Sequence, residues 1–135
     1  MSNLVCISGG FDPIHIGHVR LIKEAAKYGP VVVILNTDLW LERKKGYRFM
    51  QWADRAEVLA AMRGVHSVVS VYDDDDSVCE ALRRIKPKYF ANGGDRLPDN
   101  TPEVQLCKEL GIEMLFNIGG VKAESSSELV RNVQR

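Results

Sequence analysis

The sequence predicts an α/β protein in which helices cover both faces of a five-stranded parallel sheet. Short, continuously apolar runs alternate with stretches of helical periodicity along the 135 residues. Because these runs are apolar on both faces, they are typical of parallel strands buried between helices. The chain contains no linker, internal repeat or low-complexity segment, so we expect a single domain, residues 1–135.

Each element follows from this alternation in turn. We expect strands at residues 4–8, 31–35, 65–71, 89–91 and 112–116. We expect helices at residues 17–28, 54–62 and 77–85, a fourth from residue 101 to 110, and a fifth from residue 125. Thr101 followed by Pro102 marks one helix start, and Ser125 with Glu128 forms a capping-box pattern at another. Right-handed crossovers in this order give a small doubly wound, Rossmann-like domain that binds ligands beyond the carboxyl ends of its strands.

Charge and cysteine content narrow the possible classes of protein. Eighteen basic residues balance 18 acidic ones, so no overall field attracts the chain to nucleic acid or to an anionic membrane. The first residues lack the pattern of a signal peptide, and no apolar run is long enough to cross a bilayer. Cys6, Cys79 and Cys107 are widely spaced and fit buried, reduced thiols. We therefore expect a cytoplasmic enzyme or binding domain.

Residues 8–18, SGGFDPIHIGH, carry the most informative chemistry. Gly9 and Gly10 allow a ligand to approach the backbone closely, and Gly17 leaves open space beside it. His15 and His18 lie three residues apart at the expected helix start, so their rings can face the same side. The free N–H groups of a helix N-terminus suit phosphate, to which two imidazoles can donate hydrogen bonds. A histidine metal pair and a purely structural loop are the alternatives.

Residues 10–18 resemble the HxGH signature of the cytidylyltransferase-like nucleotidyltransferases, whose surroundings commonly read G-x-F-D-x-x-H-x-G-H. The resemblance implies that His15 and His18 stabilise the reacting phosphates while the acceptor phosphate attacks the α-phosphorus directly. It extends over essentially the whole chain. The heptose-1-phosphate adenylyltransferases and the glycerol-3-phosphate cytidylyltransferases are the most similar branches, both small and usually dimeric, which implies a homodimer.

Basic residues after the second strand are the next candidates. Residues 44–48 and 54–59 are similar to the heptose branch's Lys-Gly…Arg and D-R-x-x-V-L segments. Lys44 and Lys45 lie at the ligand end of the sheet, where their ammonium groups can reach phosphate, and we assign Lys45 a catalytic role. The alternative is a solvated basic loop. Arg55 is a candidate phosphate contact or, equally, a partner in an ion pair on the helix surface.

The expected nucleotide site combines three segments of the chain. Its predicted residues are Gly9, Gly10, Phe11, Asp12, Gly17, Asn92, Gly94, Asp95, Lys122, Ser125, Ser126 and Ser127. Residues 92–95 resemble the family's K-G-G-D and suit recognition of a base edge, although Asp95 can instead form an Asx turn. The three serines resemble the family's I-S-[ST]-[ST] at a helix N-terminus. Here the sequence departs from the family pattern, with Glu124 before the serines and Lys122 in place of an arginine.

These observations predict transfer of AMP or CMP from ATP or CTP to a small phosphorylated acceptor, a sugar or polyol phosphate, with release of pyrophosphate. We expect Mg²⁺ to arrive with the triphosphate rather than in a protein cage, with Asp12 ordering its loop or helping to place the ion. The aspartates at 73–76 fit a solvated loop, with Asp76 or Ser77 capping the next helix, better than a metal site. Trp40 and Trp52 fit either the acceptor pocket or a subunit interface. The alternative function is a non-catalytic nucleotide-binding or sensor module.

Overall fold

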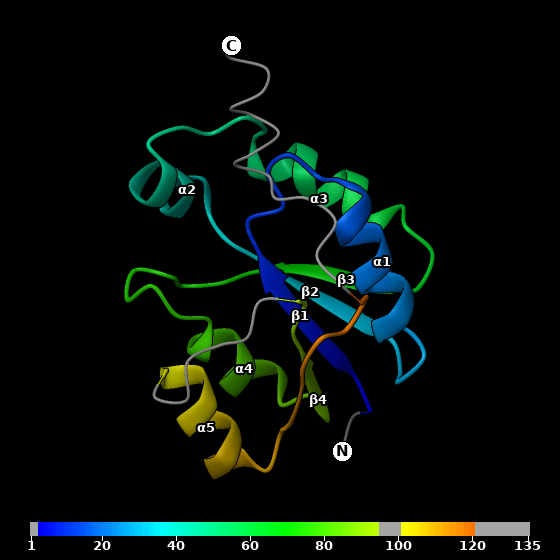
Figure 1. Cartoon of the computed structure of the whole chain (residues 1–135). Coiled ribbons are helices and arrows are strands. Elements are labelled where there is room, and N and C mark those ends of the chain that lie inside the picture. The colour runs from blue at the N-terminus through cyan, green and yellow to red at the C-terminus, as the bar shows by residue number, and fades with distance from the viewer. Residues whose placement is uncertain (1–2, 95–100, 121–135) are drawn as a thin grey trace.

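The computed structural model describes residues 3–94 and 101–120 and confirms the predicted α/β fold (Figure 1). The strands are β1 (Val5–Gly9), β2 (Val31–Leu35), β3 (Val65–Ser70), β4 (Tyr89–Ala91) and β5 (Glu113–Leu115). The helices are α1 (Ile16–Ala25), α2 (Asp38–Lys45), α3 (Trp52–Ala60), α4 (Cys79–Ile85) and α5 (Pro102–Leu110). The expected helix from residue 125 lies outside the described residues.

All five strands are parallel and lie in the order β3-β2-β1-β4-β5. β1 is therefore central, with Val5 paired with Val31 of β2 on one side and with Tyr89 of β4 on the other. The chain builds outward from β1 to β3 and then returns to place β4 on the opposite side of β1. This reversal creates a topological switch point between β1 and β4, where doubly wound folds bind ligands.

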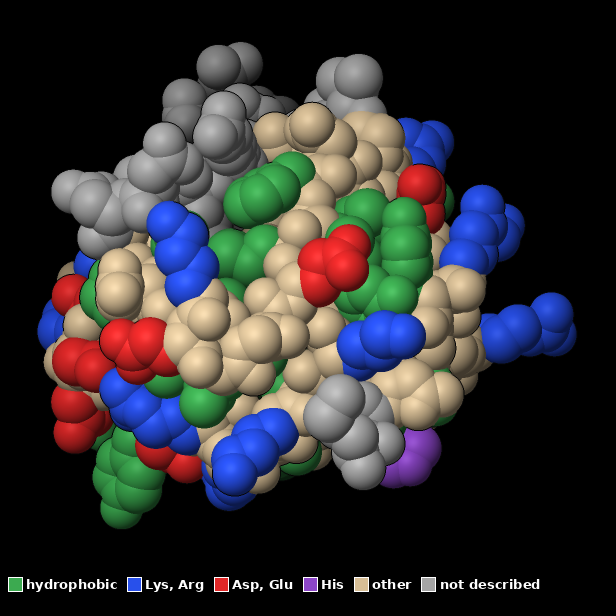
Figure 2. Space-filling view, turned by 90° about the horizontal axis from the view of Figure 1, so that it is seen from below, with side chains coloured by type: hydrophobic (Ala, Val, Ile, Leu, Met, Phe, Trp, Pro, Cys, Tyr) green, Lys and Arg blue, Asp and Glu red, His purple; other side chains and the backbone are tan. Residues whose placement is uncertain are grey.

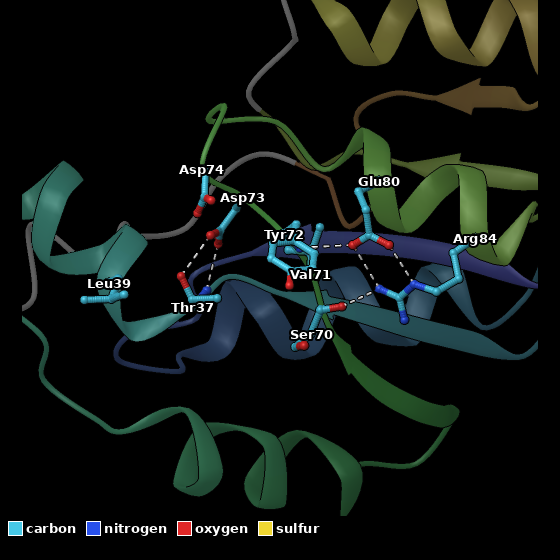
Figure 3. A pocket seen from close by; sticks show the side chains of 9 residues that line it. All are labelled: Thr37, Leu39, Ser70, Val71, Tyr72, Asp73, Asp74, Glu80 and Arg84. Carbon is cyan, nitrogen blue, oxygen red and sulfur yellow. Dashed lines mark hydrogen bonds and ion pairs between the residues drawn. The ribbon is translucent and has the colours of Figure 1, made fainter.

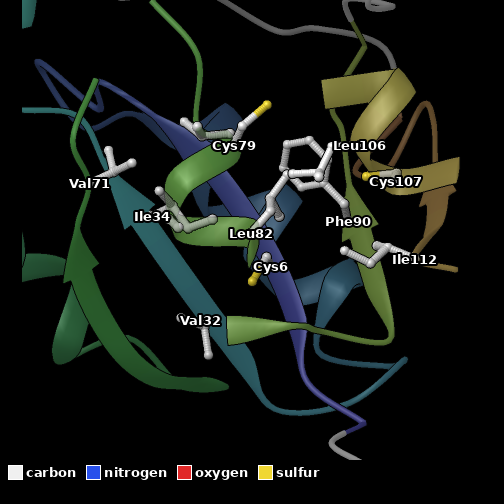
Figure 4. Packing of buried hydrophobic residues seen from close by; sticks show 12 residues of the cluster. Cys6, Val32, Ile34, Val71, Cys79, Leu82, Phe90, Leu106, Cys107 and Ile112 are labelled. Carbon is white, nitrogen blue, oxygen red and sulfur yellow. The ribbon is translucent and has the colours of Figure 1, made fainter. Parts of the chain in front are cut away.

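Helices cover the two faces of the sheet and enclose two apolar cores. α1 and α3 lie on one face, and α4 and α5 lie on the other (Figure 1). The first core includes Ile22 from α1 and Leu59 from α3. The second includes Leu82 from α4, Leu106 from α5 and Phe90 from β4 (Figure 4). The central strands β1 and β2 are largely buried, as their continuously apolar sequences require, whereas the edge strands β3 and β5 are partly exposed.

The sequence missed one helix, α2. Thr37 caps its N-terminus by accepting a hydrogen bond from Trp40 N at 3.1 Å. Gly46 ends it in the left-handed conformation, at φ 80°, which glycine adopts most readily. Lys44 and Lys45 therefore lie in the last turn of a helix, not in the loop that the alternative interpretation expected.

The surface agrees with the balanced composition. Seen from below, Lys and Arg side chains are interspersed with acidic, apolar and uncharged surface (Figure 2). Within residues 3–94 and 101–120, no helix combines the length and apolar character that crossing a bilayer requires.

Candidate functional site

The predicted catalytic histidines lie where β1 ends at the switch point. Residues 10–15 lead from β1 into α1, and His15 is the N-cap of that helix, at φ −140° and ψ 178°. His18 lies in the first turn of α1. The strand and the helix together hold both side chains at the carboxyl end of the central strand.

The two histidines cap the helix reciprocally. His15 Nδ1 accepts a hydrogen bond from Gly17 N at 3.1 Å, and His18 Nδ1 accepts one from His15 N at 3.1 Å. The arrangement matches a capping box, with imidazoles in place of the usual hydroxyl and carboxylate. Their rings stack with centroids 3.8 Å apart. A ring nitrogen that accepts carries no proton, so each neutral ring holds its proton on Nε2 and can donate from there.

Two residues before the histidines, Gly10 and Phe11, shape the loop through their packing. Phe11 is buried, at 3% exposure, and its ring lies 4.6 Å from that of His18. At Gly10 an added Cβ would lie 2.7 Å from Leu41 Cδ2, so a side chain there would collide with α2. Gly10 therefore allows the loop to pack against α2. Gly9 ends β1, and Gly17 N donates to His15 Nδ1, while their assignment to the nucleotide site stays a prediction.

Asp12 orders the protein's own backbone, which was one of the two roles expected for it. Its carboxylate is fully buried and accepts from Phe49 N at 2.6 Å and from Met50 N at 2.7 Å. Each oxygen thus has a backbone donor, and a role for Asp12 in placing Mg²⁺ stays a prediction. The hydrogen bonds join the histidine loop to the connection between α2 and α3.

Arg55 corrects the expectations placed on it. It does form an ion pair, with Asp38 at 2.7 Å, but its side chain is fully buried rather than on the helix surface, so it has no exposed face for a phosphate to contact. The guanidinium donates to Gly10 O at 2.7 Å, Asn36 O at 3.0 Å, Met50 O at 3.0 Å and Asp38 Oδ1 at 2.7 Å. It therefore connects the loop after β1, the start of α2 and the connection before α3.

The two lysines of α2 differ in surroundings. Lys44 Nζ forms an ion pair with Asp76 Oδ2 at 3.1 Å, which directs it toward the loop between β3 and α4. Lys45 is half-buried in the same last turn. A phosphate contact by either lysine stays a prediction.

The aspartate run is only partly the solvated loop that we expected. Asp73 is buried and accepts from Asn36 Nδ2 at 3.1 Å, Thr37 N at 2.8 Å and Thr37 Oγ1 at 2.9 Å. Asp76 pairs with Arg43 and Lys44, and hydrogen bonds from these two side chains lower its pKa. The N-cap of α4 is Val78, so the predicted cap at Asp76 or Ser77 was wrong.

The loop after β4 lies across the switch point from α2. Asn92 Nδ2 donates to Phe90 O and Leu115 O, both at 3.2 Å, and so ties β4 to β5. Gly94 is exposed at the end of the described segment. Asp95, Lys122, Ser125, Ser126 and Ser127 lie outside the described residues, and their assignment to the nucleotide site stays a prediction.

A cavity of about 540 Å³ opens between α2 and α4, beyond β3 (Figure 3). It is lined by Thr37, Leu39, Ser70, Val71, Tyr72, Asp73, Asp74, Glu80 and Arg84. Glu80 and Arg84 form an ion pair at 2.9 Å, and Arg84 also donates to Ser70 O at 2.7 Å. Neither histidine lines this cavity.

The two tryptophans have different environments. Trp52 Nε1 donates to Leu35 O at 3.2 Å, and its ring packs against the core beneath α3. Trp40 lies beside Gly10, and its Nε1 is buried without a hydrogen-bond partner. Trp52 is thus structural, whereas Trp40 borders the histidine loop.

No group of three or more His, Cys, Asp or Glu side chains among residues 3–94 and 101–120 is arranged to hold a metal ion. A dedicated metal cage therefore does not form part of the described site. The expectation that Mg²⁺ arrives on the triphosphate stays a prediction.

Fold and site together define a doubly wound domain that presents ring N–H donors and a helix N-terminus at its switch point, an arrangement suited to nucleotide phosphates. The family model described as cytidylyltransferase-like matches residues 6–131. The chain belongs to the cytidylyltransferase-like family. Membership confirms the predicted enzyme class, a nucleotidyltransferase domain.

Curated relatives cover the chain almost completely. It is 35% identical to the bifunctional protein HldE of Gluconobacter oxydans over 98% of its length, and 29% identical to the HldE of Geobacter metallireducens, also over 98%. It spans only 28% and 27% of those proteins. The match to HldE proteins is consistent with the predicted heptose branch. The HldE proteins are several times longer than the segment that they share with this chain.

A solved structure supports the same fold. The lipopolysaccharide core biosynthesis protein from Thermoplasma volcanium superposes with a TM-score of 0.70 at 19% sequence identity. The match covers 84% of this chain and 93% of that one. At this identity the likeness concerns the fold alone.

Proposed function

We propose that this domain transfers AMP or CMP from ATP or CTP to a small phosphorylated acceptor, a sugar or polyol phosphate, and releases pyrophosphate. The observation that carries the proposal is the reciprocal cap of His15 and His18. In this cap, Nδ1 of each ring accepts a hydrogen bond, so the proton of the neutral ring lies on Nε2, which is the hydrogen-bond donor. Both donors lie at the N-terminus of a ten-residue helix, whose partial positive charge also favours phosphate.

The reaction is a direct displacement at phosphorus. An oxygen of the acceptor phosphate bonds to the α-phosphorus as the bond between that phosphorus and the bridging β-oxygen breaks. Pyrophosphate leaves with the electron pair of the broken bond. His15 and His18 donate from Nε2 to phosphoryl oxygens on which negative charge grows, and Lys45 adds a positive charge nearby. Mg²⁺ enters as part of the triphosphate substrate and neutralises its phosphate oxygens.

The choice between ATP and CTP rests on resemblance. The segments at 44–48 and 54–59 favour the heptose branch and therefore ATP. The similarity to two HldE proteins points the same way. Parallel assays with the two nucleotides decide between them.

Pyrophosphate release in the presence of Mg²⁺ tests the proposal. ATP and CTP are each paired with heptose 1-phosphate, other sugar phosphates and glycerol 3-phosphate. Release must depend on the acceptor. We expect His15→Asn and His18→Gln to lower kcat by about 100-fold or more, because each keeps a side chain able to cap the helix but removes the imidazole donor.

His66 provides the matched control. It is the third histidine of the chain and lies exposed on β3. His66→Ala should retain the kcat of the wild type. An equal loss of kcat in His15→Asn, His18→Gln and His66→Ala would contradict a catalytic role for His15 and His18. Nucleotide binding without release for any acceptor would favour the non-catalytic sensor.

A further inference from the structure

The connection between α2 and α3, residues 46–51, is fixed to the histidine loop by two buried side chains. Asp12 accepts hydrogen bonds from Phe49 N and Met50 N, and Arg55 Nε donates to Met50 O. Asp12 and Arg55 have no exposed surface, so little water competes for these bonds. The backbone at residues 49 and 50 is therefore held in one position relative to the histidine pair.

Phe49 directs its ring outward from this fixed backbone. The residue is 57% exposed and belongs to neither apolar core. A single exposed apolar side chain requires no special explanation by itself. Here, however, the exposed aromatic residue is anchored through its own amide to the motif that carries the histidines. Such preorganisation lowers the entropy lost when a ligand packs against it.

The sheet order places this ring on one side of the switch point. β4 and its loop lie on one side of β1, whereas β2 and α2 lie on the other. If the nucleoside binds beside the loop after β4, the acceptor lies on the β2 side of the histidines. Lys45 ends α2 on that side, and Phe49 follows four residues later. The ammonium group of Lys45, which can bind the acceptor phosphate, and the apolar ring of Phe49 are thus only four residues apart in the sequence.

We propose that Phe49 is a specificity-determining residue that forms the apolar wall of the acceptor subsite and selects a cyclic sugar phosphate over a linear polyol phosphate. This inference rests on the proposed function. A sugar ring has a face of C–H groups that packs on an aromatic ring while its hydroxyls stay at the edge. Glycerol 3-phosphate is acyclic, so no ring holds its C–H groups together on one face.

Steady-state kinetics of Phe49→Ala test the proposal. With heptose 1-phosphate as acceptor, we expect KM for the acceptor to rise about tenfold or more and KM for the nucleotide to change by less than about twofold. The preference of the wild type for heptose 1-phosphate over glycerol 3-phosphate should shrink in the variant. Phe49→Tyr should restore the acceptor KM, because it keeps the ring.

Tyr72→Ala is the matched control for loss of an exposed aromatic side chain. Tyr72 is 76% exposed and lines the separate cavity beyond β3, so its removal should leave both KM values unchanged. The inference is overturned if Phe49→Ala leaves the acceptor KM unchanged, raises both KM values equally, or if the wild type prefers glycerol 3-phosphate.

Calorimetric titration with heptose 1-phosphate separates this inference from the proposed function. If heptose 1-phosphate binds more weakly to Phe49→Ala than to the wild type, the role of Phe49 in the acceptor subsite is supported, even where no pyrophosphate is released. In that case only the proposed function fails. A wild-type protein that binds no cyclic sugar phosphate overturns the wall. Pyrophosphate release with a linear acceptor would in that case leave the proposed function standing.

Discussion

Arg55 connects three loops of the site through one side chain. Its guanidinium donates to the carbonyls of Gly10, Asn36 and Met50 and pairs with Asp38, all without contact with solvent. A buried charge of this kind is tolerated only when its donors have partners. Arg55 therefore holds the histidine loop against the connection before α3 and the start of α2.

Arg55→Met should lower the free energy of unfolding by about 3–5 kcal/mol, because Asp38 and the three carbonyls lose their buried donor. Urea denaturation followed by circular dichroism measures the change. Arg84→Met is the control, since Arg84 is half-exposed and its pair with Glu80 contributes about 1 kcal/mol or less. Similar losses in the two variants would contradict the anchoring role of Arg55.

At the scale of elements, apolar runs and capping signals together predicted the helices and strands of residues 3–94 and 101–120, apart from α2. The bounds of β2 and β4 match the expected ranges, and α1, α3, α4 and α5 lie where the sequence placed them within a few residues. α2 was missed because only Leu41 is buried in it. Its signals were Thr37 before it and Gly46 after it, which are capping signals rather than periodicity.

The candidate site could be predicted only where its residues are local in sequence. The histidine loop lies within eleven consecutive residues and was found. Asp73 and Asn36, by contrast, are 37 positions apart, and Asp12 and Met50 are 38 apart. No spacing rule links such partners, so the roles of Asp73 and Arg55 as anchors of the site became visible only in the folded chain.

For the whole molecule, the core explains the state of the cysteines. All three thiols are free and buried in the core between the sheet and the α4–α5 layer (Figure 4). Burial raises the pKa of Cys6 to about 12 and that of Cys107 to about 11, from an ordinary value of 9.0. These thiols therefore stay protonated in the native state at pH values where the unfolded chain ionises.

The free energy of unfolding should consequently fall as the pH rises from about 9 to about 11, because the unfolded state loses thiol protons that the native state keeps. Urea denaturation at several pH values measures this. Cys107→Ala should show a smaller fall than the wild type over the same interval. An equal fall in the free energy of unfolding of both proteins would show that other groups cause it. Rapid reaction of the native thiols with a disulfide reagent at pH 8 would contradict their burial.

The homodimer implied by the family resemblance remains a prediction at this scale. Light scattering of the purified chain should give about twice its mass of 15.1 kDa. A mass of one chain at micromolar concentration would contradict it.

The central claim is that the domain transfers a nucleotidyl group. The most direct measurement follows ATP and CTP labelled at the α-phosphorus, in the presence of Mg²⁺ and a phosphorylated acceptor. The account predicts that the label moves into a new diphosphate-linked product, that one pyrophosphate appears per product, and that His18→Gln abolishes both. Label that remains in a nucleoside diphosphate, with phosphate transferred from the γ-position, or that ends in free AMP or CMP, would contradict the account.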